Sequence, residues 1–132
     1  MDFGELRSLL NRPPSELGWR RVCWFLERAW TTRRPEAARS WLPYAESHLE
    51  GWPDALRRCP TRWARHLILE PDFEPGRLVR QLRVMGLRGD RARLERLLEA
   101  PCWSQLTALE APRQRLDDAA LGRLLERAPP RL

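Results

Sequence analysis

The feature that most constrains this chain is a stretch that occurs twice. Shifted by 27 positions, residues 79–99 fall onto residues 106–126 without a gap. The identical pairs are Leu82/Leu109, Arg88/Arg115, Asp90/Asp117, Ala92/Ala119, Leu94/Leu121, Arg96/Arg123, Leu97/Leu124, Leu98/Leu125 and Glu99/Glu126. An ungapped internal repeat of this length is typical of solenoid proteins, in which a unit buries its apolar face only by stacking on its copy. The repeat therefore predicts two copies of one structural element packed side by side.

Each copy combines the signals of a short strand and a helix. Apolar residues alternate with polar or small ones over 82–84 and 109–111, which favours a strand with one buried face. Asp90 and Asp117 then stand where a helix N-cap is needed, and leucines spaced at i, i+3 and i+4 follow each of them. We therefore expect strand, turn and helix in that order within each copy.

This order of elements resembles a leucine-rich repeat of the long, helix-bearing type, as in ribonuclease-inhibitor-like proteins. The segment LTALEAPRQRLDDAALGRLLERAP carries the resemblance, which covers about a third of the chain. A helical segment ahead of such repeats also resembles proteins of GC-rich bacteria, including myxobacteria. The resemblance implies a parallel sheet covered by helices. The chain departs from the family at Leu87 and Gln114, where the family has Asn, and at Gly89, which matches Leu116 in the second copy.

The expected fold class is α/β and mostly helical. A helical N-terminal cap is expected over 1–69, and 70–132 is expected to hold two leucine-rich-repeat-like units, 79–105 and 106–132. An all-α helical repeat or bundle stays open, because both strand candidates can also be read as helices. Within the cap, Pro43 is expected to divide a helix that begins at Pro35. Residues 64–69 can form a strand or a further helical piece, and the strand is favoured.

Composition and motifs point away from catalysis. The two histidines lie among apolar residues, no Cys or His pair has the spacing of metal ligands, and no glycine-rich phosphate loop occurs. We therefore expect no enzyme, no cofactor and no metal. The charged N-terminus and the lack of an apolar run of about 20 residues predict a cytoplasmic protein without a membrane span.

The resemblance implies a partner-binding surface formed by residues between the buried strand positions. These residues, with two that flank them, are Arg80, Gln81, Arg83, Met85, Ala108, Glu110, Pro112 and Gln114. Arg83 and Met85 are the first choices, because Arg and Met are enriched at interfaces. The chain reaches Pro129 and Pro130 where a third strand is expected, so the strand at 106–111 is expected to be an open edge. The sequence thus predicts a protein-protein interaction module or adaptor that binds a protein partner or a second copy of itself through this edge.

Nucleic-acid binding is the alternative. All 24 basic residues are arginine, and the net charge is +6. The candidate set is Arg20, Arg21, Arg33, Arg34, Arg57, Arg58, Arg62 and Arg65, together with exposed tryptophans. However, the arginines are spread over the whole chain among 18 acidic residues, whereas a phosphate-binding surface concentrates its charge on one face. Nucleic acid is therefore the less favoured partner.

Overall fold

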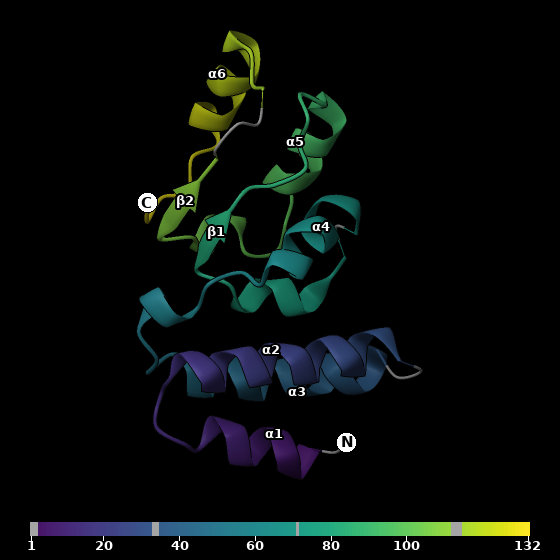
Figure 1. Ribbon diagram of the computed structural model, residues 1–132, viewed down its shortest axis with the longest axis vertical. Coiled ribbons are helices and arrows are strands. Elements are labelled where there is room, and N and C mark those ends of the chain that lie inside the picture. Colours follow the sequence, from purple (N-terminus) through teal and green to yellow (C-terminus); the bar gives the residue numbers. More distant parts are fainter. Residues whose placement is uncertain (1–2, 33–34, 71, 112–114) are drawn as a thin grey trace. The chain divides into compact units, whose positions relative to one another are not determined.

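The computed structural model confirms a mostly helical α/β fold (Figure 1). It describes residues 3–32, 35–70, 72–111 and 115–132. Within these ranges it contains six α-helices and two short parallel strands. The chain divides into two compact units, Met1–Arg57 and Arg58–Leu132, whereas the sequence interpretation set the boundary after residue 69.

The first unit is helical. It contains α1 (Phe3–Leu10), α2 (Glu16–Thr31), α3 (Pro35–Leu49) and a 3-10 helix, η1 (Asp54–Leu56). The hydroxyl of Ser15 accepts a hydrogen bond from the Gly18 N–H at 2.9 Å, which caps α2. α2 and α3 pack side by side, and α1 contacts both (Figure 1). The core of this unit is formed by apolar side chains spaced at helical intervals on all three helices.

The predicted break at Pro43 is wrong, because α3 continues through that residue. Pro43 is exposed, while Leu42, Ala45 and Leu49 on the opposite face are completely buried. Burial of this apolar face outweighs the backbone hydrogen bond that proline cannot donate.

The second unit alternates helices with strands. Its elements are α4 (Thr61–Leu69), η2 (Glu74–Leu78), β1 (Gln81–Arg83), α5 (Arg91–Leu98), η3 (Trp103–Gln105), β2 (Ala108–Glu110) and α6 (Asp118–Glu126). The predicted strand at 64–69 is wrong, because these residues belong to α4. Trp63, Ala64, Leu67 and Ile68 are buried with helical spacing, and α4 packs against α5 and β1. Burial of these helically spaced side chains therefore stabilises a helix despite the strand propensity of the segment.

The two strands pair in the register of the sequence repeat. Gln81 lies beside Ala108, Leu82 beside Leu109 and Arg83 beside Glu110, so each pair is separated by the same 27 residues as the two copies. Asp90 and Asp117 cap α5 and α6 through hydrogen bonds to backbone N–H groups, as predicted. Because both strands form, the all-α alternative does not hold.

The turn between strand and helix also repeats. Arg88 and Arg115 both have left-handed backbones, with φ angles of 52° and 53°. Gly89 has a φ of 73°, and a Cβ added to it would lie 3.3 Å from the Arg115 carbonyl oxygen. A side chain at position 89 would therefore be strained and would press on the neighbouring turn, which explains why Gly89 departs from the repeat.

Ion pairs join α5 to α6. The Arg123 guanidinium donates to both carboxylate oxygens of Glu95, at 2.8 and 3.1 Å, and Arg127 Nη1 lies 3.6 Å from Glu99 Oε1. The hydrogen bond from Arg123 lowers the pKa of Glu95 below its ordinary value, and the same contact raises the pKa of Arg123. The bidentate geometry fixes the relative orientation of the two helices.

This pair predicts an acid-sensitive contact. A carboxylate whose pKa is lowered by folding stabilises the native state above its unfolded pKa of about 4.3, and that contribution is lost as the pH falls through the folded pKa. We therefore expect Glu95→Gln to lower the free energy of unfolding at neutral pH and to converge with the parent protein in acid. Urea unfolding between neutral pH and pH about 3 would measure this. A constant difference across that range would contradict the prediction.

Candidate functional site

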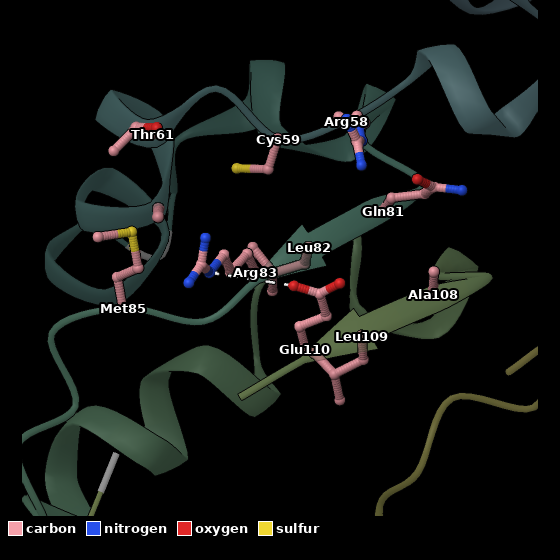
Figure 2. A pocket seen from close by; sticks show the side chains of 11 residues that line it. Arg58, Cys59, Thr61, Gln81, Leu82, Arg83, Met85, Ala108, Leu109 and Glu110 are labelled. Atoms are coloured by element: carbon pink, nitrogen blue, oxygen red, sulfur yellow. Dashed lines mark ion pairs between the residues drawn. The ribbon is translucent and has the colours of Figure 1, made fainter. Parts of the chain in front are cut away.

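A pocket of about 390 Å³ lies on the second unit, along the exposed side of its two strands (Figure 2). Its lining comes from three segments: residues 58–64, β1 with the adjoining Met85, and β2. In Figure 2 the first segment lies opposite β2, and the side chain of Arg83 lies between them. The repeat thus places equivalent residues of both copies on one concave surface.

Most of the predicted partner-binding residues lie in this pocket. Gln81, Arg83, Met85, Ala108 and Glu110 line it. Side chains alternate along β1, where Leu82 is buried and Arg83 is exposed, so the residues flanking the buried leucine reach the pocket.

Three predicted residues are not placed in the pocket. Arg80 donates instead to the backbone carbonyls of Arg77 and Val79, at 2.8 and 3.0 Å, and does not line the cavity. Pro112 and Gln114 lie outside the described residues.

The sequence interpretation missed one side of the pocket. Arg58 forms an isolated parallel bridge with Gln81, and the Cys59 N–H donates to the Gln81 carbonyl at 2.8 Å. Residues 58 and 59 therefore run beside β1 on the side away from β2. Pro60 could have indicated this extended segment, because the residue before a proline is driven toward extended backbone and away from helix.

The charges at the centre of the pocket are exposed and loosely paired. Arg83 Nε lies 3.9 Å from Glu110 Oε2, and both side chains are largely accessible to solvent (Figure 2). An exposed pair at this distance contributes little to stability, about 0–1 kcal/mol. Both groups can therefore turn to opposite charges on a bound chain at small cost.

Cys59 and Cys102 of the second unit and the two histidines of the chain have defined surroundings. Burial raises the pKa of the Cys59 thiol, which lines the pocket, and raises the pKa of Cys102 to about 12. A thiol that stays protonated at neutral pH is a poor nucleophile. His66 stacks on Phe73 and lies 3.3 Å from a Glu70 carboxylate oxygen, and His48 contacts the Tyr44 carbonyl at 3.1 Å. Each histidine therefore has a contact within its own unit.

The second copy of the repeat leaves leucines uncovered that the first copy buries. Leu98 in α5 is 2% exposed, whereas its equivalent Leu125 in α6 is 72% exposed. Likewise Leu94 is 1% exposed and Leu121 is 45% exposed. Since the residues are identical, the difference arises from their surroundings: α5 packs against both α4 and α6, and α6 packs against α5.

In the described part of the chain, the edge of the sheet formed by β2 is unpaired, on the same side of the second unit as α6. β1 pairs with β2 on one side and with Arg58 on the other, whereas β2 pairs with β1 alone among the residues that the structure describes. In Figure 1, β2 and α6 lie on the same side of β1 and α5. We call the unpaired edge of β2 and the uncovered side of α6, with Leu121 and Leu125, the C-terminal face.

Comparison of the chain with protein-family models, curated proteins and solved structures found no match. In the described part of the chain, every helix is too short or too polar to cross a bilayer. Those same residues contain no group of three or more His, Cys, Asp or Glu side chains that could hold a metal ion. The geometry of the C-terminal face and of the strand pocket is therefore the basis for a functional proposal.

The nucleic-acid alternative loses part of its predicted surface. Arg57 is 3% exposed and donates to the Leu49 carbonyl at 3.3 Å, so it cannot contact a phosphate backbone. Arg33 and Arg34 lie outside the described residues. Trp24 is exposed, and the Arg28 guanidinium lies over its ring at 4.8 Å from the centroid. Buried tryptophans fill the two cores instead: they are Trp19, Trp52, Trp63 and Trp103.

Proposed function

We propose that this protein is a non-enzymatic protein-protein interaction module of the leucine-rich-repeat type, and that its C-terminal face binds a second copy of the chain. The observation that carries the proposal is the contrast between Leu98 and Leu125, identical residues of the repeat that are buried in one copy and exposed in the other. In a solenoid, such an apolar face is covered by the next unit of the stack. A neighbouring protein chain would provide the same cover.

The parallel strands support the assignment to leucine-rich repeats. Their offset of 27 residues equals the sequence repeat, and the turn at Arg88 has the same left-handed backbone as the turn at Arg115. The three free cysteines fit a reducing compartment, which supports the cytoplasm as the location.

A second copy is the occupant that fits the open edge best. An exposed strand edge pairs readily with an identical strand, and a two-fold arrangement brings the same apolar patch of each copy together. Leu121 and Leu125 would then be buried against their counterparts, and Arg83 and Glu110 of the strand pocket would lie close to the junction.

Molecular mass in solution tests the proposal. We expect light scattering across a wide concentration range to show a dimer for the parent protein and a monomer for the double variant Leu121→Glu/Leu125→Glu. Leu17→Glu is the matched control, because Leu17 is an exposed leucine of α2 in the first unit and is expected to leave the dimer intact. A parent protein that stays monomeric at high concentration would overturn self-association.

A further inference from the structure

A second groove, separate from the C-terminal face, gathers four arginines. It has a volume of about 720 Å³ and is lined by Arg65 of α4, Arg88, Arg93 of α5 and Arg115, with no acidic side chain among its described lining residues. A concave surface lined by one sign of charge focuses the electrostatic field and raises the local concentration of oppositely charged ligands. The groove is therefore suited to an anionic ligand.

Three of the four guanidinium groups are available to a ligand. Arg93 is held in place, since its Nη1 donates to the Gly86 carbonyl at 2.6 Å and its Nε lies 3.7 Å from Asp90 Oδ2. Arg65, Arg88 and Arg115 are exposed, and none of them forms an ion pair with a residue that the structure describes. Unneutralised charges gathered in one groove repel each other, and an anion would relieve that repulsion.

The repeat and the backbone bring two of these arginines together. Arg88 and Arg115 are equivalent residues, one in each copy, and the parallel strand register sets their turns beside each other. Both have left-handed backbones, which are uncommon for residues other than glycine and which, where strained, cluster at functional sites. Glycine would suit this backbone better, so arginine at both positions points to a use for the side chains.

The other lining residues indicate which class of anionic ligand fits the groove. Leu69 and Met85 are exposed aliphatic side chains of the groove, and Ile68 lies beside them. The described lining contains no aromatic ring, so it offers no platform on which bases could stack. The volume lies within the range of about 300–1,000 Å³ that is typical of sites for drug-sized ligands, well above the size of a free phosphate ion. These features together fit a chain that carries both carboxylates and aliphatic side chains.

We propose that this arginine groove binds an acidic peptide segment of a partner protein, with its carboxylates on Arg65, Arg88 and Arg115 and an aliphatic side chain against Leu69 and Met85. Arginine suits this role because its planar guanidinium pairs with a carboxylate through two parallel hydrogen bonds. The site goes beyond the self-association proposed above, because it names a different surface and a different partner chemistry.

The test uses a short fluorescein-labelled peptide in which Glu alternates with Leu, followed by fluorescence anisotropy. We expect the parent protein to bind it and to lose affinity for two matched peptides, one with Gln in place of Glu and one with Ser in place of Leu. Arg88→Gly and Arg115→Gly are each expected to weaken binding by about tenfold, as the loss of a charge-assisted bidentate contact would. Arg96→Ala is the control, because Arg96 is exposed on α5 outside the groove and should leave affinity unchanged.

The glycine variants separate binding from folding. Because glycine suits the left-handed backbone at both positions, we expect the thermal midpoints of these variants to match or exceed that of the parent. Their molecular mass should also be unchanged, so a failure of the C-terminal face and a failure of the arginine groove are distinguishable. Equal binding of the Gln peptide, unchanged affinity of both glycine variants, or tighter binding of a single-stranded oligonucleotide than of the acidic peptide would each overturn the proposal.

Discussion

Replacing Leu98 by alanine is expected to lower the free energy of unfolding by about 3 kcal/mol, whereas the same replacement at Leu125 is expected to change it by less than about 0.5 kcal/mol in the monomer. Leu98 is 2% exposed, so its removal loses buried apolar contacts and leaves a cavity. Leu125 is 72% exposed and loses little of either. The two positions are equivalent in the repeat and lie near the C-terminal ends of α5 and α6, so the intrinsic helix preference of alanine affects both alike.

Urea unfolding followed by far-ultraviolet circular dichroism would measure both variants at a concentration where the protein is monomeric. Raising the protein concentration provides a further readout. If the C-terminal face is covered in a dimer, Leu125→Ala becomes more destabilising as the dimer forms, while the effect of Leu98→Ala stays nearly constant. Equal losses for the two variants in the monomer would contradict the described burial of α5 and α6.

The sequence predicted the parts of the fold that depend on local pattern. The alternation around Leu82 and Leu109 identified both strands, and the shared spacing of Asp90 and Asp117 identified the two helix starts. The parallel pairing of the strands was implied by the resemblance to leucine-rich repeats, in which equivalent residues of successive units lie side by side. Five of the eight predicted partner-binding residues line the strand pocket for this reason.

The sequence did not predict features that depend on packing between dissimilar segments. Arg65 belongs to α4, which has no counterpart in the repeat, so its position beside Arg88 and Arg115 could not be read from their spacing. The bridge from Arg58 to Gln81 joins segments that share no pattern. The different burial of Leu98 and Leu125 was also not predictable, because a residue's identity does not record which neighbour covers it.

Each of the two proposed surfaces contains side chains that the repeat leaves exposed: leucines in one and arginines in the other. At the C-terminal face, the second copy exposes the leucines that the first copy buries against its neighbours. In the arginine groove, the repeated turn places like charges from both copies together, with no carboxylate among the described lining residues to neutralise them. One surface therefore favours apolar contact and strand pairing, and the other favours an acidic chain. A module with both could hold a partner peptide while it is assembled on its own copy.

Replacing Pro43 by alanine is expected to raise the free energy of unfolding by roughly 2–2.6 kcal/mol. Pro43 lies within α3, where a proline costs about 3 kcal/mol relative to alanine because it cannot donate a backbone hydrogen bond and its ring crowds the preceding turn. Against this gain, alanine gives the unfolded chain more freedom, which lowers stability by about 0.4–1 kcal/mol. No packing is lost, because Pro43 is exposed and the buried face of α3 is formed by Leu42, Ala45 and Leu49.

Pro13→Ala is the matched control for this prediction. Pro13 is also exposed but lies between α1 and α2, outside any helix, so its replacement affects only the unfolded chain. We expect it to leave stability unchanged or to lower it by up to about 1 kcal/mol. Urea unfolding of both variants gives the comparison. A Pro43→Ala variant that is no more stable than the parent would mean that α3 bends or frays at this residue in solution, since only a continuous helix regains the missing hydrogen bond.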